Sequence, residues 1–179
     1  MFRRPGLADT ARGQAPEDAA PAQRRATGGK PSLRARAIAL LSGREHSSQE
    51  LRRKLAPHAE SEDQLDTLLA ELRALGYLSE ERFVQSLIQR RSARYGLRRI
   101  ARELDEHGVA TEIRAPMMQS LAEGERDRAL AAWQKRFGKP PVDLAERAKQ
   151  HRFLAQRGFD GETIAWVMRQ ARDQQGSDI

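Results

Sequence analysis

The stretch "LRRIARELDEHGV" at residues 97–109 decides the fold, because its pattern returns later in the chain. The stretch "AKQHRFLAQRGF" at residues 148–159 follows the same plan, with a leucine, Leu104 or Leu154, four residues before a glycine. An apolar residue follows each glycine, and a polar turn and another helical pattern come next. The two leucines are 50 residues apart. Self-similarity at a period of this size is the sequence signature of a repeat protein.

A third copy of the pattern lies earlier, in "LRRKLAPHAESEDQL" at residues 51–65, where the turn is longer and contains a proline. Leu55 of this copy precedes Leu104 by 49 residues. Each copy belongs to a unit of the form helix, helix, turn, helix. Units this small either stack and share their apolar faces or form independent helix-turn-helix modules. The predicted units cover residues 33–78, 79–122 and 123–174.

Apolar residues recur with helical spacing in nearly every segment after residue 32. In residues 61–78 they lie at i, i+3, i+4 and i+7, which is the pattern of an amphipathic helix, and Gly76 is predicted to end that helix. Alternating patterns are nearly absent, and aromatic residues make up only 5% of the chain. The sequence therefore predicts an all-α protein whose three tandem three-helix repeats form an elongated, curved molecule.

Short polar motifs mark the predicted helix starts. Ser47, with Glu50 three residues later, forms a capping box, in which the hydroxyl and the glutamate each bind a backbone N–H of the first turn. Thr111 is predicted to cap the helix that follows it. A later helix is predicted at about residues 142–157, with Pro140 or Pro141 in its first turn, where the N–H that proline lacks would have no partner within the helix.

The segment "HSSQEL" also contains residue types found in hydrolases, namely His46, Ser47 and Glu50. A hydrolytic triad needs three side chains that converge beside an oxyanion site, and adjacent residues on one helix start do not supply that geometry. The chain has no cysteine, no glycine-rich phosphate loop and no histidine pair with metal-ligand spacing. We therefore predict no catalytic residue, no cofactor and no metal.

The charge points to a polyanionic partner, since the net charge is +7 and the pI is about 10.5. The stretch "RRSARYGLRRIAR" at residues 90–102 holds six arginines and no acid. Arginine pairs with phosphate and with carboxylate, so DNA or an acidic protein surface would fit, and a solvated face is the alternative. The predicted contact residues are Arg52, Arg53, Lys54, Arg90, Arg91, Arg94, Arg98, Arg99 and Arg102.

Residues 1–32 are rich in proline, glycine, alanine and arginine without apolar periodicity, which predicts a disordered tail. No apolar run approaches the roughly 18 residues of a membrane span. The lack of cysteine suits a reducing cytoplasm. We expect a cytoplasmic monomer with no membrane association.

Four fragments in this order resemble the RecX family of bacterial RecA regulators: "RAIALLSGREHSSQELRRKL", "LLAELRALGYLSEERFVQSLIQRR", "YGLRRIARELDEHGV" and "FLAQRGFDGETI". The resemblance covers about residues 33–172. Family members usually have an aspartate-rich turn after "GYL", and this chain has Ser79, Glu80 and Glu81 there.

The resemblance implies a protein that binds RecA–DNA filaments along their helical groove. It implies that binding modulates, and mainly inhibits, ATP hydrolysis, strand exchange and coprotease activity. Direct contact with single- or double-stranded DNA would suit the arginines. The alternative function is a helix-turn-helix DNA-binding protein that acts without RecA.

Overall fold

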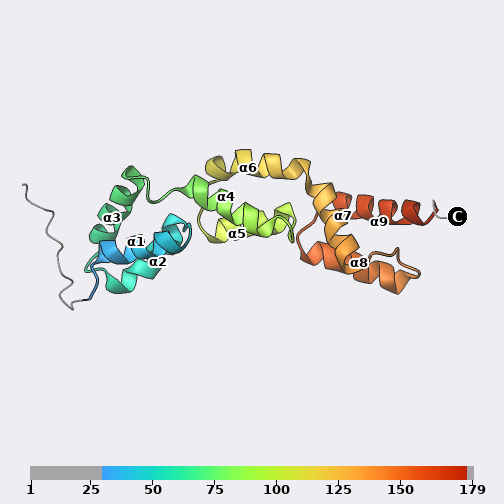
Figure 1. Ribbon diagram of the computed structural model, residues 1–179, viewed down its shortest axis with the longest axis horizontal. Coiled ribbons are helices and arrows are strands. Elements are labelled where there is room, and N and C mark those ends of the chain that lie inside the picture. Colours follow the sequence, from blue (N-terminus) through green and yellow to red (C-terminus); the bar gives the residue numbers. More distant parts are fainter. Residues whose placement is uncertain (1–29, 177–179) are drawn as a thin grey trace, which may run out of the picture. The chain divides into compact units, whose positions relative to one another are not determined.

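The structure is a computed structural model, which describes residues 30–176. Within this range the chain contains only helices and connecting turns, so the all-α prediction is confirmed (Figure 1). Most of the tail predicted at residues 1–32 lies outside the described residues. The helices are α1 (Leu33–Gly43), α2 (Ser48–Leu55), the short 3-10 helix η1 (Ala56–His58), α3 (Glu62–Ala74), α4 (Glu80–Arg91), α5 (Leu97–Glu106), α6 (Thr111–Glu123), α7 (Glu125–Arg136), α8 (Leu144–Gln156) and α9 (Gly161–Gly176).

Three separate hydrophobic clusters form the core, and each is built by three consecutive helices. The first includes Leu51 and Leu55 of α2, and the second includes Ile100 and Leu104 of α5. The third includes Leu154 of α8, and these leucines and the isoleucine are fully buried. We call α1–α3, α4–α6 and α7–α9 the first, second and third helix groups. The unit boundaries drawn from the sequence remain a prediction.

The third group has one buried polar pair where the others have apolar residues. Gln150 of α8 takes the position that Ile100 holds in α5, and it is buried. Its side-chain oxygen accepts a hydrogen bond of 2.7 Å from the indole nitrogen of Trp133, which is 1% exposed. Its side-chain nitrogen donates to the backbone oxygen of Lys139 at 3.2 Å. The pair satisfies the indole N–H inside the cluster, as a buried tryptophan requires.

Two predicted helix starts are wrong. Thr111 is the first residue of α6 rather than its cap, and the cap position is held by Ala110 without a side-chain hydrogen bond. Pro140 and Pro141 precede α8 instead of lying in its first turn, because Asp143 caps that helix by accepting from the Glu146 N–H at 2.7 Å. The predicted end of α3 is confirmed, since Gly76 has a φ of 74°.

The capping box is half confirmed. The Ser47 hydroxyl accepts from the Glu50 N–H at 3.1 Å, as predicted. The Glu50 carboxylate does not reach back to the cap but accepts from the Arg44 guanidinium, with one contact at 3.1 Å. It also lies 3.1 Å from Nδ1 of His46 and 3.6 Å from Nζ of Lys54. Burial of the carboxylate, which is 5% exposed, explains the difference, because a buried charge needs charged partners.

This cluster makes stability depend on pH. Burial lowers the pKa of His46 below its ordinary value of 6.5. Burial alone would raise the pKa of Glu50, but the Arg44 hydrogen bond and the nearby positive charge lower it from 4.5 to about 2. For both groups the unfolded chain binds more protons in acid, so the folded state loses stability as the pH falls. The loss begins near pH 6.5 for His46 and continues from pH 4.5 toward pH 2 for Glu50.

Replacing Glu50 by glutamine is therefore expected to destabilise the protein by on the order of 1–3 kcal/mol at neutral pH, because Arg44 loses its carboxylate. The difference from the parent protein should shrink in acid, because between pH 4.5 and pH 2 the parent's unfolded chain binds a proton that the folded Glu50 carboxylate does not. Urea unfolding at about pH 7 and about pH 3 measures the free energy of unfolding of the parent and of the variant, and so gives their difference at each pH. Glu112→Gln, at an exposed position of α6, is the control. A difference that is the same at both pH values would contradict the role given to Glu50.

Candidate partner-binding surface

The N-terminus of α5 is bound directly to the turn between α8 and α9. The Gly96 N–H donates to the Arg157 carbonyl at 2.9 Å, and the Arg98 N–H donates to the Gly158 carbonyl at 3.2 Å. The Arg99 guanidinium donates to the Gln156 carbonyl at 3.3 Å. Helix α5 has no side-chain cap of its own, so these bonds supply acceptors for its free N–H groups. We call this contact the α5 junction.

Two glycines allow this close approach. A Cβ on Gly96 would lie 2.5 Å from the Gly158 carbonyl oxygen. A Cβ on Gly158 would lie 2.5 Å from Cβ of Arg99, and Gly158 also has a φ of 85°, which side chains rarely tolerate. The pairing of the second and third helix groups therefore depends on the absence of a side chain at both positions.

A buried glutamate completes the junction, and a second glutamate has the same role elsewhere. Glu125, the first residue of α7 and 5% exposed, accepts from the Leu97 N–H at 2.9 Å. Burial raises the pKa of Glu125, while the bond from Leu97 opposes that rise. Glu80, the first residue of α4, accepts from the Ser48 N–H of α2 at 2.7 Å. In both cases the first residue of one helix group binds the first residue of the middle helix in the preceding group.

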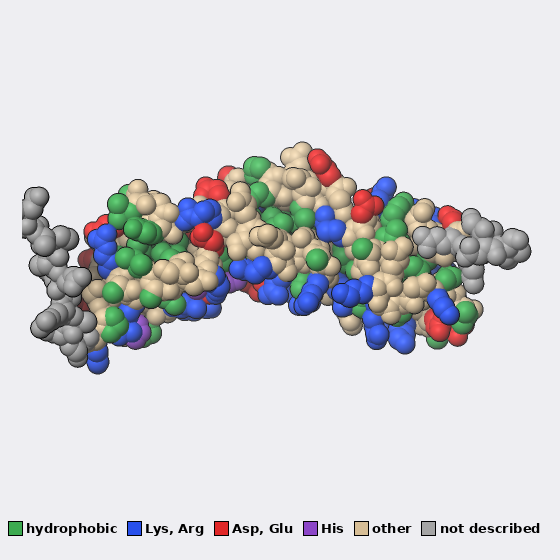
Figure 2. All heavy atoms as spheres, in the orientation of Figure 1, with side chains coloured by type: hydrophobic (Ala, Val, Ile, Leu, Met, Phe, Trp, Pro, Cys, Tyr) green, Lys and Arg blue, Asp and Glu red, His purple; other side chains and the backbone are tan. Residues whose placement is uncertain are grey.

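The α5 junction places three of the predicted arginines around one cleft. Arg98, Arg99 and Arg102 from α5 line it with His151 from α8, and its volume is about 360 Å³. Arg99 stacks on Tyr95, with its guanidinium carbon 4.1 Å from the ring centre. We call these four side chains, three arginines and one histidine, the basic cleft. In Figure 2, Lys and Arg side chains gather along the lower edge of the view, over α5 and α8.

The other predicted basic residues do not all offer a free charge. Arg52 pairs with Glu62 at 2.7 Å and with Asp66, so its charge is already matched. Arg91 pairs with Glu103 at 2.8 Å, and this carboxylate raises the pKa of the arginine. Arg102 is only 3.6 Å from Glu106, and both side chains are exposed, so that pair is weak.

The remaining predicted residues fall into two further sets. Lys54 faces Glu50, and Arg90 donates to the Ser86 hydroxyl at 3.0 Å. Arg53, Arg94 and Arg98 are exposed and pair with no carboxylate among residues 30–176. The structure thus brings Arg98, Arg99 and Arg102 together, and it leaves Arg52, Arg53 and Lys54 on α2 in another helix group.

Sequence reasoning missed His151, Gly96 and the two junction glutamates. One signal was available, because Glu80 and Glu125 both open the first helix of a group. No sequence signal announced the pairing of Gly96 with Gly158, which lie 62 residues apart.

The fold and the cleft define an all-helical repeat protein with an exposed basic surface. Family models match two parts of the chain: the second three-helix domain of RecX at residues 79–115 and the third at residues 123–168. The chain is 46% identical over 140 residues to the Regulatory protein RecX of Ralstonia nicotianae, covering 78% of this chain and 88% of the relative. It is 50% identical over 133 residues to that of Herbaspirillum seropedicae, covering 74% and 86%. The chain belongs to the RecX family.

Solved structures agree with this fold. The crystal structure of RecX from Lactobacillus salivarius superimposes with a TM-score of 0.67 at 15% identity, covering 78% of this chain and 94% of that one. A second crystal structure, of regulatory protein RecX, gives a TM-score of 0.64 at 17% identity, covering 79% and 73%. The chain therefore has the fold of RecX proteins. The curated relatives support a regulatory role. No helix in the described range is long and apolar enough to cross a bilayer.

Proposed function

We propose that this protein binds RecA–DNA filaments and lowers RecA's ATP hydrolysis, strand exchange and coprotease activity. In this proposal it acts in the cytoplasm as a monomer, without a cofactor and without catalysis of its own. The observation that carries the proposal is the basic cleft, where three arginines are held on one surface by a backbone junction. Membership of the RecX family supplies the regulatory role.

The chemistry of the cleft supports a filament partner. A nucleoprotein filament presents carboxylates and phosphates repeatedly, and a guanidinium binds either by two parallel hydrogen bonds. Arg98 is exposed without a carboxylate partner in the described chain, while Arg99 is fixed by Tyr95 and by the Gln156 carbonyl. A pre-oriented arginine loses less conformational entropy on binding than a free one. Arg53, Arg90 and Arg94 would extend the contact along the same chain.

Replacing Arg98, Arg99 and Arg102 together by alanine is expected to weaken inhibition of RecA's ATPase on single-stranded DNA by about tenfold or more, since a hydrogen bond to a charged group is worth about 1.5–3 kcal/mol. The measurement is the protein concentration that halves the ATPase rate. The matched control replaces Arg73, Lys135 and Lys149, which are exposed, remove the same charge and lie outside the cleft. Circular dichroism verifies that both variants are folded.

Two results would count against the proposal. If the parent protein leaves the ATPase unchanged at a full molar ratio to RecA, the protein does not regulate RecA in this way. If the control variant weakens inhibition as much as the cleft variant, net charge rather than the cleft is responsible.

The same arginines also suit DNA phosphates directly, which is the second candidate function. A helix-turn-helix DNA-binding protein acting without RecA would bind DNA tightly by itself. The logarithm of its binding constant would fall linearly with the logarithm of the salt concentration. The slope would be about −0.9 per phosphate neutralised on duplex DNA, or about −0.7 on single strands. Weak DNA binding without RecA, combined with strong inhibition in its presence, favours the filament regulator.

A further inference from the structure

The segment before α8 presents apolar side chains to solvent in a fixed conformation. Val142 is 81% exposed and Leu144 is 82% exposed, the highest values among the large hydrophobic residues described. The Val142 N–H donates to the Glu146 carboxylate at 3.1 Å, and Asp143 caps α8. Proline at 140 and 141 restricts the backbone further. These side chains therefore stay in solvent because the segment is held there.

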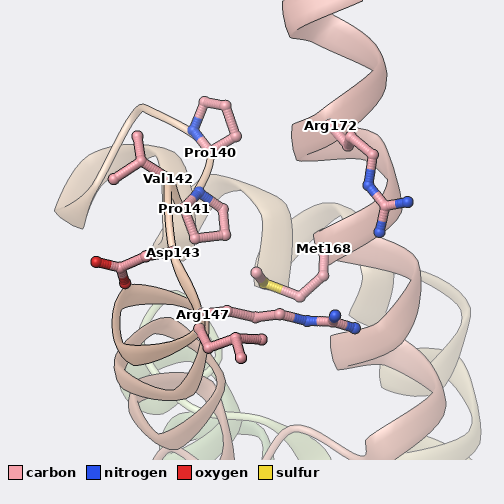
Figure 3. Close-up of a pocket in the computed structure, with 8 residues that line it drawn as sticks. Pro140, Pro141, Val142, Asp143, Arg147, Met168 and Arg172 are labelled. Atoms are coloured by element: carbon pink, nitrogen blue, oxygen red, sulfur yellow. The ribbon is translucent and has the colours of Figure 1, made fainter.

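A cleft of about 340 Å³ lies beside this segment, between the start of α8 and the middle of α9. Its apolar lining comes from both prolines, from Val142 and Leu144, and from Met168 of α9. Figure 3 shows the Met168 side chain extending from α9 into the space beneath the prolines. We call this region the α8–α9 cleft.

Two arginines give the α8–α9 cleft a positive edge. Arg147 of α8 extends toward α9 below Met168, and Arg172 lies on the same side, as Figure 3 shows. Neither pairs with a carboxylate among residues 30–176, and the nearby Glu146 is occupied by the Val142 N–H. The Asp143 carboxylate points away on the opposite side of the cleft. An incoming carboxylate could bind these guanidinium groups without displacing an existing partner.

We infer that the α8–α9 cleft binds an acidic peptide segment of a partner protein, with an apolar side chain over Met168 and carboxylates on Arg147 and Arg172. An apolar lining with charged groups at one edge is the usual construction of a peptide-binding groove. Nucleic acid fits less well, because the lining has no aromatic side chain on which a base could stack. This inference goes beyond the proposed function, whose residues lie in the basic cleft.

The test uses the full-length protein labelled with ¹⁵N and titrated with a short synthetic peptide of leucine, phenylalanine and glutamate. The expected result is saturable amide shifts concentrated at residues 142–147 and 168–172, with a Kd of about 10–100 μM for a contact of this size. A peptide with lysine in place of glutamate should give no saturable shifts there. RecA is absent, so failure of this test leaves the proposed function untouched.

Two double variants separate the parts of the site. Arg147→Glu with Arg172→Glu, and Val142→Ser with Leu144→Ser, should each weaken peptide binding about tenfold or more. The control is Arg152→Glu with Arg169→Glu, which changes the same charge on exposed positions of the same helices outside the cleft. Because all of the substituted positions are exposed, the variants are expected to fold, and circular dichroism checks this.

The inference is overturned if no saturable shifts appear, if they fall outside the cleft, or if the control weakens binding equally. It is also overturned if a thymidine oligonucleotide gives the same shifts with higher affinity, since the surface would then be a nucleic-acid site.

Discussion

Replacing Trp133 by alanine is expected to unfold the third helix group while the other two groups persist. The side chain is 1% exposed and is the largest fully buried one in its cluster, and loss of such a tryptophan costs about 3–5 kcal/mol. The change also removes the indole N–H that Gln150 binds, which leaves a buried amide without its partner. The three clusters are separate, so the loss should be centred on α7–α9 and reach beyond them only at the α5 junction, whose acceptors lie in α7 and in the α8–α9 turn.

Amide hydrogen exchange followed by mass spectrometry resolves the three groups. Protection should fall in α7–α9, while α2, α3 and α4 keep protection close to that of the parent. Trp166→Ala is the control, because Trp166 is only half-buried at the margin of the same cluster and should cost less. Equal loss of protection in all three groups would mean that the clusters unfold as one cooperative unit.

Replacing Gly96 by alanine should open the α5 junction without harming the helices on either side. Gly96 has a φ of −80°, which any residue adopts, so the substitution adds no backbone strain. The new methyl group would instead lie 2.5 Å from the Gly158 carbonyl oxygen, a contact that forces the turn away. We expect the basic cleft to widen and inhibition of RecA to weaken together with it, if the cleft is the contact surface.

Exchange rates of single amides report the opening directly. The N–H groups of Gly96 and Arg98 donate across the junction, and their protection should fall about tenfold or more in the variant. The Leu104 amide, inside α5, should keep its protection. Gly161→Ala is the matched control, because a Cβ there meets nothing within 4 Å. Unchanged protection at Gly96 and Arg98 would show that the junction tolerates the methyl group.

The sequence predicted those parts of the fold that depend on neighbours along the chain. The helical spacing of leucines reports burial on one face, so Leu55, Leu104 and Leu154 were correctly identified as repeat positions. The Ser47 hydroxyl and Gly76 likewise act within one or two turns of their own helix. The sequence therefore predicts a contact correctly where the two residues lie only a few positions apart in the chain.

Contacts between distant residues explain the errors. Asp143 caps α8, so the two prolines lie outside the first turn. The Asp143 side chain accepts a hydrogen bond from a backbone N–H of that turn, which a proline in the turn could not do. The Glu50 carboxylate was predicted to bind a backbone N–H at the start of its own helix. In the structure it contacts Arg44 and His46 instead. The basic cleft combines residues of α5 with His151 of α8, and no periodicity within one segment can report that combination.

The glutamates at the starts of α4 and α7 have a consequence for dividing this chain. In each of the first two groups, the first N–H of the middle helix donates to a glutamate of the group that follows. The acceptor is Glu80 for α2 and Glu125 for α5. A fragment cut at the end of α3 or α6 would lose that acceptor although it kept all three of its own helices. Fragments intended to represent a single group should therefore run through the opening turn of the next one, even though that turn belongs to another core.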